Sequence, residues 1–229
     1  MKYIKRYMKV DWNANRNRII LFADIMGFTK MVQNNKHSDF LKQFRKFLDR
    51  LKSLMMPLQA GNHLRITVFS DTIVIGADSC TIKNLNLIVK ASAILMYVCH
   101  EFKWPINGCI ACGNLTFEIP IMTQQQIEEY RKKKIIPFNV PILIGDAVIN
   151  SYAINSKMFC YGIVLHENAI PLLTASVQEG IIQPFYMVQV PFKDDSSESL
   201  YYLSWIEVPT QINNEKITYQ DLIDRLEKK

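Results

Sequence analysis

The stretch from Arg18 to Lys30 constrains the fold of this chain more than any other. Residues 18–23 are an almost unbroken run of apolar, β-prone side chains, which is typical of a strand buried on both faces. The run ends at Asp24, and the following Met-Gly-Phe-Thr segment predicts a sharp turn into a helix. A lone carboxylate at the end of a buried strand is costly unless its charge is compensated, and a divalent cation is the usual compensation. The sequence therefore predicts a metal-binding acid where a strand meets a helix.

A second acid is expected at the tip of a hairpin. Residues 63–69 and 72–76 are two β-prone runs separated only by Ser70 and Asp71. If the first strand lies beside this hairpin, Asp24 and Asp71 converge at one end of a sheet. That arrangement can hold one or two Mg²⁺ or Mn²⁺ ions over a triphosphate. Two other roles remain open, because Asp24 could cap the following helix and Asp71 could be an ordinary turn residue.

These two segments resemble the class III nucleotidyl cyclases. Residues 22–29, F-A-D-I-M-G-F-T, resemble the F-A-D-I-x-G-F-T signature of that family, and Phe-Ser-Asp at 69–71 resembles its second metal-aspartate hairpin. The resemblance covers roughly residues 18–160. It implies that Asp24 and Asp71 are the catalytic residues and, with the backbone carbonyl of Ile25, the ligands of two Mn²⁺ or Mg²⁺ ions per site.

The expected elements follow the order β-α-β-β-α-β, the ferredoxin-like α+β arrangement, which is also the cyclase core. Helices are expected on one face of an antiparallel sheet, and a hairpin is expected near the C-terminus. The predicted elements are a strand at 18–23, a helix at 38–56 opened by Ser38 and closed by Pro57, a hairpin at 63–76, a helix at 82–102, a strand at 106–117, helices at 146–156 and 167–176, and a hairpin that pairs 181–190 with 200–208.

The length of 229 residues and the apolar content of 49% favour one compact domain with a substantial core. We expect an N-terminal arm at 1–17 and a cyclase domain at 18–208, interrupted by a polar insertion at 118–141. The remainder, 209–229, is expected to form a C-terminal helix and tail, opened by a capping-box-like start at Thr218.

Composition narrows the class of ligand and the compartment. The formal net charge of +6 favours an anionic ligand, but the basic residues come in short runs, so no nucleic acid is expected as a partner. The longest apolar stretch, 85–102, is interrupted by polar residues and predicts a buried helix, not membrane insertion. Five cysteines, an odd number, and the lack of a recognisable signal peptide predict reduced thiols and a cytoplasmic location.

The chain departs from the family at the phosphate-binding arginine. In the family, that arginine follows a small-residue pair, whereas here Asn114 follows Cys112-Gly113. Other cations must then bind the triphosphate. Arg65, Lys193 and the basic arm are candidates, and the sequence does not select among them.

A second departure lies in the segment that resembles the family's G-x-x-V-N-x-A-x-R. Gly145 matches, but Ile149 replaces the asparagine and Ala153 replaces the arginine, residues that contact the ribose and the transition state in the family. Asn150 or Asn155 could substitute for the asparagine only with a changed register.

The positions that read the base have also changed. Thr67 stands where adenylyl cyclases carry a lysine, and Ile142 stands where they carry an aspartate; the guanine-reading acid and cysteine pair is absent too. Thr67 could also be an ordinary β-branched strand residue. A site that binds by hydrogen bonds rejects ligands that leave its groups unpaired, so losing both readers should change the base. The expected nucleotide-binding residues are Phe22, Gly27, Phe28, Thr29, Arg65, Thr67, Asn114 and Ile142.

In size, in the 22–29 signature and in Gly145 followed by Ser151-Tyr152, the chain resembles the pyrimidine cyclases of bacterial Pycsar anti-phage systems. That resemblance implies a homodimer with sites at its interface that converts UTP or CTP into the 3′,5′-cyclic monophosphate plus pyrophosphate. The product would act on a separate effector protein. Two alternatives remain: an adenylyl or guanylyl cyclase with unusual base readers, and a non-catalytic nucleotide-binding module on the same fold.

The remaining chemical signals are weak. Cys109-x-x-Cys112 lies in a predicted strand and has no second pair of ligands at zinc spacing, so a structural role is favoured over a metal or redox role. The four histidines are scattered, and no arrangement of serine, histidine and aspartate for nucleophilic catalysis can be argued.

Overall fold

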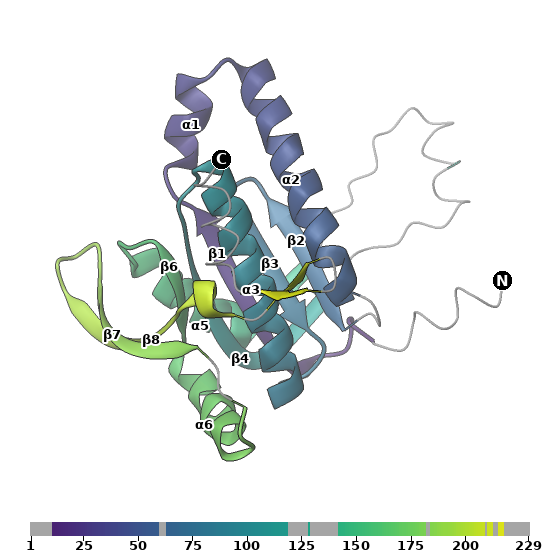
Figure 1. Ribbon diagram of the computed structural model, residues 1–229, viewed down its shortest axis with the longest axis vertical. Helices are drawn as coiled ribbons and strands as arrows, with labels where there is room; N and C mark the ends of the chain where they lie inside the picture. The colour runs from purple at the N-terminus through teal and green to yellow at the C-terminus, as the bar shows by residue number, and fades with distance from the viewer. Residues whose placement is uncertain are drawn as a thin grey trace.

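A twisted mixed sheet is the frame of the molecule (Figure 1). The computed structural model describes residues 11–59, 63–118, 128, 142–181, 184–208, 210–212 and 215–217. Within these, eight strands follow the order β2-β3-β1-β4-β6-β8-β7, with β5 paired to β4. Neighbouring strands are antiparallel except β4 and β6, which are parallel. The strands are β1 Arg16–Ile25, β2 Leu64–Phe69, β3 Thr72–Ala77, β4 Ile106–Glu118, β5 Ile142–Ile144, β6 Gly162–Leu165, β7 Phe185–Pro191 and β8 Ser197–Leu203, with a separate pair of β9 Thr210–Ile212 and β10 Glu215–Ile217.

Helices cover both faces of this sheet. Figure 1 shows α2 and α3 across one face, where they bury the odd-numbered side chains of β1 such as Leu21. The helix α5 packs on β4 and β1 from the opposite face, where Ile20 and Ala147 share a second apolar cluster. The helices are α1 Phe28–Asn34, α2 His37–Gln59, α3 Ile82–Phe102, α5 Asp146–Lys157 and α6 Ile170–Gln178, with short 3₁₀ turns η2 Glu167–Ala169 and η3 Trp205–Glu207.

The predicted fold class and the predicted order of core elements agree with this arrangement. The strand expected to be buried on both faces is β1, in which Ile19, Ile20 and Leu21 are all fully buried. The expectation of helices on one face holds for α2 and α3 but must be corrected for α5. Because successive side chains of a strand point to opposite faces, a strand that is apolar at every position needs cover on both sides.

The main core lies between the sheet and the pair α2–α3. Phe47 of α2 is fully buried, with its ring centroid 5.0 Å from that of Trp104 and 5.5 Å from that of Phe102. Among the described residues, α3 is the one helix long and apolar enough to cross a membrane by length and composition, and 72% of its apolar window is buried inside the structure. That burial agrees with the predicted role of α3 as a core helix.

The ends of the two long helices show where local signals succeed and fail. The helix α3 spans the predicted residues 82–102, and Thr81 caps it, since its side chain accepts a hydrogen bond from the backbone N–H of Asn84. Pro57 does not end α2, which continues to Gln59, and this corrects the predicted end. A proline in the last turn removes only one late hydrogen bond, which the packing of α2 against α3 can tolerate.

The folded unit reaches back into the segment expected to be an arm. Trp12 is only 1% exposed, and the guanidinium carbons of Arg18 and Arg65 lie 5.0 and 5.1 Å from its ring centroid. The arm before residue 11, nearly all of the expected insertion at 118–141 and the terminal helix expected from Thr218 lie outside the described residues.

The cysteines require a correction. Cys80 and Cys112 form a disulfide, with their Cα atoms 6.3 Å apart, whereas all five cysteines were expected to be reduced. The two residues lie 32 positions apart in sequence and are brought together by the fold, so the odd count gave no sign of this pair. Cys109 is buried in the cluster on the opposite face, so Cys109 and Cys112 do not form a joint metal or redox site.

The aromatic core predicts a clear difference between two positions of α2. Replacing Phe47 with alanine should lower the free energy of unfolding by about 3–5 kcal/mol, because it leaves a cavity among Phe102 and Trp104. Met56→Ala, at a side chain that is 62% exposed, should change it by less than about 0.5 kcal/mol. Urea unfolding followed by circular dichroism measures both, and equal midpoints for the two variants would contradict this description of the core.

Candidate functional site

The two predicted acids lie at the same end of the sheet. In the antiparallel register of β1 and β3, Asp24 is directly opposite Thr72, the residue that follows Asp71 in the hairpin turn. The backbone N–H of Ile25 donates to the carbonyl of Asp71 at 3.0 Å, which ties the turn to the end of β1. Ser70 takes a left-handed conformation (φ 55°) that makes the tight turn possible. The hairpin predicted from the sequence therefore brings Asp71 to Asp24.

Asp24 does not cap the following helix. The N-cap of α1 is Gly27, in a left-handed conformation (φ 73°), and no side chain caps this helix. Instead, the hydroxyl of Thr72 donates to Oδ1 of Asp24 at 2.5 Å, and Nδ2 of Asn155 donates to Oδ2 at 2.8 Å. The carboxylate is thus held between a strand and a helix, with one donor on each oxygen.

Opposing effects act on the charge of Asp24. Burial raises the pKa of its carboxyl above the usual value, and the negative charge of Asp71 raises it further. The hydrogen bonds from Thr72 and Asn155 and the positive charge of Lys193 lower the pKa, but the net shift is upward. A half-buried acid next to a second acid is an environment that a cation would stabilise.

These residues fit a divalent cation of the Mg²⁺ or Mn²⁺ type. The donors are the two carboxylates and, at the end of β1, the backbone carbonyl of Ile25 as a third oxygen. The carboxylate of Asp24 accepts one hydrogen bond on each oxygen and has about four acceptor sites, so two remain for a metal. Within the described residues, no three His, Cys, Asp or Glu side chains gather at one point, so water or a bound phosphate would have to complete the coordination.

The register places Phe22 and Thr67, two of the predicted nucleotide-binding residues, on the same sheet face as Asp24. Phe22 pairs with Val74 of β3, which pairs with Thr67 of β2, so the three form one row next to that of Asp24. Thr67 is only 8% exposed. The ring of Phe22 packs edge-on against Tyr152 of α5, with centroids 5.7 Å apart. This face carries no charged side chain at the position where the family's lysine would stand.

The structure does not bring Arg65 to the acids. Its row contains Gly76 and Ile20, about 13 Å along the strand from Asp24. Its guanidinium donates to the carbonyl of Phe117 at 3.1 Å and lies over the ring of Trp12. Within this chain, Arg65 anchors the N-terminal segment at the far end of the sheet, which corrects its expected place beside the triphosphate.

Lys193 is the candidate cation whose charge acts at the acidic end. It lies between β7 and β8, and its Nζ donates to the carbonyl of Ser156 near the end of α5 at 2.6 Å. Its charge lowers the pKa of Asp24, although burial has the larger and opposite effect. The basic arm before residue 11 lies outside the described residues. The structure thus separates two candidates that the sequence left equal.

The other predicted nucleotide-binding residues are spread along the chain. Thr29 is exposed in the first turn of α1. Phe28 packs against Phe40 and Phe44 of α2, so its ring is partly buried against the apolar core. Asn114 lies far from the acids, opposite Asn17, and its amide is 3.5 Å from a carboxylate oxygen of Asp146. Ile142 begins β5, but its side chain lies outside the described residues.

The helix α5 carries the two altered family positions, Ile149 and Ala153, and also Asn155, whose role the sequence left unassigned. Ile149 and Ala153 lie on its exposed side, whereas Asn155 is 1% exposed and faces Asp24. The sequence offered Asn155 only as a substitute in another register. Its contact with Asp24 joins residues 131 positions apart, and no local pattern signals such a pair.

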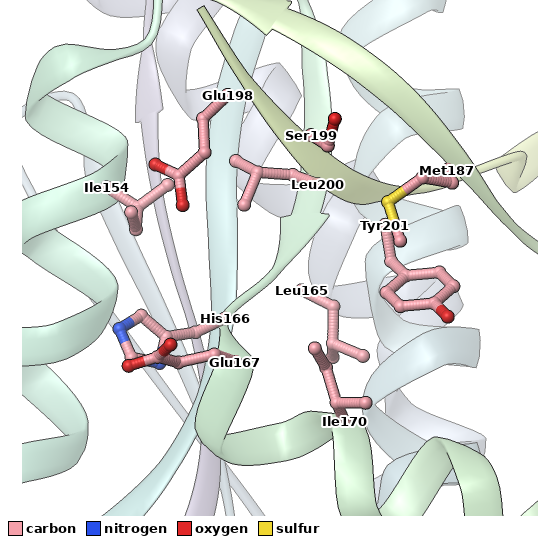
Figure 2. Close-up of a pocket in the computed structure, with 10 residues that line it drawn as sticks. All are labelled: Ile154, Leu165, His166, Glu167, Ile170, Met187, Glu198, Ser199, Leu200 and Tyr201. Carbon is pink, nitrogen blue, oxygen red and sulfur yellow. The ribbon is translucent and has the colours of Figure 1, made fainter.

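A separate cavity of about 320 Å³ lies beside α5, between β6, β8 and the turn η2. Figure 2 shows His166, Glu167 and Glu198 on the side of this pocket near Ile154, with Met187 and Tyr201 across from them. Its two carboxylates would repel a triphosphate, and none of the predicted site residues lines it. This pocket is therefore not the site formed by Asp24 and Asp71.

No protein-family model matches this sequence, and no curated protein matches it significantly. Solved structures do share its fold. The guanylate cyclase domain of RhGC from Catenaria anguillulae, solved with GTP, has a TM-score of 0.58 at 10% identity, over 82% of this chain and 96% of that one. The adenylyl cyclase CyaB from P. aeruginosa has a TM-score of 0.52 at 9% identity, over 88% and 98%. A class III adenylyl cyclase-like ATP-binding protein from Pseudomonas aeruginosa has a TM-score of 0.50 at 14% identity, over 72% and 36%.

The chain therefore has the fold of nucleotidyl cyclase domains, and the predicted fold class is confirmed. At identities of 9–14% the likeness concerns the fold and does not extend to a substrate.

Repulsion between the two acids can be tested without any metal. Because the raised pKa makes the folded protein bind a proton at Asp24 more tightly than the unfolded chain does, the metal-free protein should gain stability as the pH falls through that raised pKa. Asp71→Asn should weaken this pH dependence and raise the melting temperature at neutral pH by about 1–2 °C, from about 0.5 kcal/mol.

The matched control is Asp49→Asn, which changes the net charge equally at an exposed position of α2. Because the chain already carries a formal net charge of +6, removing a remote negative charge should bring no such gain. Equal shifts in thermal melts with EDTA would show a general charge effect and no local repulsion.

Proposed function

We propose that this chain is a nucleotidyl cyclase that acts on a pyrimidine nucleoside triphosphate, UTP or CTP. The observation that carries the proposal is the half-buried Asp24 carboxylate beside the hairpin acid Asp71, on a fold shared with adenylyl and guanylyl cyclases. A divalent cation in such a site binds both the acids and the triphosphate, because the metal neutralises the negative charges that these groups bring together.

In the proposed reaction, the 3′ oxygen of the ribose forms a bond to the α-phosphorus as the bond to the leaving pyrophosphate breaks, and the 3′ proton passes to water. Bound Mg²⁺ or Mn²⁺ would lower the pKa of the 3′-hydroxyl and neutralise the leaving phosphates. Asp24, Asp71 and the carbonyl of Ile25 would hold the ions. Lys193, whose charge already acts at Asp24, would attract the phosphates.

The pyrimidine assignment rests on the base-reading positions. Thr67, 8% exposed on the same face as Phe22 and Asp24, offers a hydroxyl where the family's adenine reader offers a charge. Ile142 replaces the second reader. A hydroxyl and an alkyl group cannot supply the ion-assisted contacts that hold a purine, so a different base is favoured. By resemblance to the Pycsar enzymes, the cyclic product would serve as a second messenger in anti-phage defence, acting on a separate effector protein.

We also propose a homodimer with active sites at its interface. One solved structure of similar fold is described as a dimeric guanylyl cyclase domain. Here the outer side of α5 and the neighbouring β5 expose apolar side chains: Ile149 is 65% exposed, Tyr152 54% and Ile144 67%. Exposed apolar groups on one side of a molecule are typical of an interface.

A non-catalytic nucleotide-binding module is the second candidate. Ile149 and Ala153 stand at the family's transition-state positions, and Asn114 is engaged with Asp146 far from the acids. One protein of similar fold is described as a cyclase-like ATP-binding protein. Such a module would bind a nucleotide and release no pyrophosphate.

The deciding experiment incubates the purified protein with each of the four nucleoside triphosphates and Mn²⁺, and resolves the products by mass. We expect cyclic UMP or cyclic CMP, reduced by about 100-fold or more in Asp24→Ala and Asp71→Ala because the metal ligands are lost. Asp49→Ala, at an exposed position of α2, should retain activity.

Cyclic AMP or GMP would refute the base assignment and keep the cyclase. If no triphosphate yields a product but nucleotide binding is measurable, the binding module becomes the better conclusion.

The dimer is tested by sedimentation equilibrium. Ile149→Asp should convert the dimer into monomers, because a carboxylate would be buried unpaired at the interface. Val177→Asp, on α6 with a similar exposure of 59%, should remain dimeric. A wild-type monomer at micromolar concentration, or a dimer that withstands Ile149→Asp, would contradict the proposed interface.

A further inference from the structure

The side chain of Asn155 is a polar group next to Asp24, and it has no role in the reaction proposed above. It lies in the last turn of α5, is 1% exposed, and its Nδ2 donates to Oδ2 of Asp24 at 2.8 Å. On the other side, Thr72 donates to Oδ1 at 2.5 Å. The two oxygens of one carboxylate therefore have separate donors from two elements, a strand and a helix.

We propose that Asn155 is a positioning residue, which holds Asp24 of its own chain in the orientation that binds the divalent cation. The inference rests on the metal site of the proposed function, but it concerns metal binding itself and does not depend on which nucleotide is used.

Hydrogen bonds to both oxygens restrict rotation of the carboxylate. Without Asn155, the group could turn about its terminal torsion, which has a broad energy minimum, while keeping the single bond to Thr72. With both donors in place, the remaining acceptor sites keep fixed directions. Groups that orient a metal ligand in this way typically contribute a factor of 10–100 to metal affinity.

The oxygen atom of the Asn155 side-chain amide also supports a functional role for this residue. Oδ1 of Asn155 is buried and has no hydrogen-bond partner among the described residues. An unpaired buried acceptor destabilises a fold, so packing alone would favour an apolar side chain of the same size. The N–H donor to Asp24 is the feature that an apolar replacement would lose.

The rest of α5 holds Asn155 at a defined height above the sheet. A Cβ atom on Gly113 of β4 would lie 2.7 Å from the backbone nitrogen of Ala147, so this glycine lets the helix approach the strand closely. One turn before Asn155, Ser151 is fully buried, but its hydroxyl bonds only to carbonyls of α5 itself, those of Ala147 and Val148. Ser151 thus shares the setting of Asn155 without touching Asp24.

A different role for Asn155 would be contact with the substrate, in place of the asparagine that Ile149 replaces. The burial of Asn155 and its bond to Asp24 argue against that role. The two roles differ in a measurable way. A substrate contact leaves metal binding unchanged in the absence of nucleotide, whereas a positioning residue alters it.

The test measures Mn²⁺ binding to the nucleotide-free protein, by electron paramagnetic resonance of the free ion up to millimolar concentrations. Asn155→Leu should weaken binding by about 10–100-fold. Asp71→Asn defines the signal of a lost site. Ser151→Ala, the matched control on the same buried side of α5, should bind Mn²⁺ like the wild type. The metal-free melting temperature of Asn155→Leu should equal or exceed that of the wild type, which excludes misfolding as the cause.

A double-mutant cycle tests whether Thr72 and Asn155 position Asp24 together. Thr72→Val removes the second donor while preserving the β-branched shape. Because both donors act on one carboxylate, the combined loss of affinity in Thr72→Val/Asn155→Leu should differ from the product of the single losses. Strictly multiplicative losses would overturn the joint positioning of Asp24.

The remaining outcomes separate this inference from the proposed function. Wild-type Mn²⁺ affinity in Asn155→Leu overturns the positioning role even if the protein cyclises nucleotides. Weakened affinity in that variant, with no cyclic product from any triphosphate in the wild type, supports the positioning role and removes the cyclase. A wild-type protein that binds no Mn²⁺ overturns both the metal site and this inference.

Discussion

The candidate site depends on one carboxylate, that of Asp24, held at the end of the central strand by a donor on each oxygen. Burial and the charge of Asp71 raise its pKa, whereas the donors Thr72 and Asn155 and the charge of Lys193 lower it. This balance leaves an acid pair that the protein alone does not neutralise. A cation would relieve the repulsion, so the feature that costs stability in the free protein is the one that supports the proposed chemistry.

The sheet and its helices serve this carboxylate in different ways. On one face, α2 and α3 bury the odd-numbered side chains of β1 and stabilise the strand. On the other face, α5 reaches Asp24 itself through Asn155. The hairpin of β2 and β3 supplies Asp71, and the turn between β7 and β8 supplies Lys193. Four separate parts of the chain therefore meet at one end of β1, and the fold shared with known cyclases brings them there.

Sequence reasoning succeeded where the signal is local. The strand before Asp24, the hairpin carrying Asp71 and the helix at 82–102 each rest on a pattern within one segment, and all three appear in the structure. It failed where distant segments meet. Arg65 is held by Trp12 and Phe117, and Cys80 is joined to Cys112. Such contacts cannot be predicted from the types of the side chains and their spacing in the sequence.

By itself, the sequence determined the order of the core elements and the two acids at a strand end and a hairpin tip. Alternation and turn chemistry act over a few residues, so they can be recognised without a fold. Only the tertiary structure decided that α5 covers the second face of β1, that the charge of Lys193 and not that of Arg65 acts at Asp24, and that Asn155 bonds to Asp24. The physical reason is that these depend on packing between segments up to 131 residues apart, where the burial of whole faces sets which side chains meet.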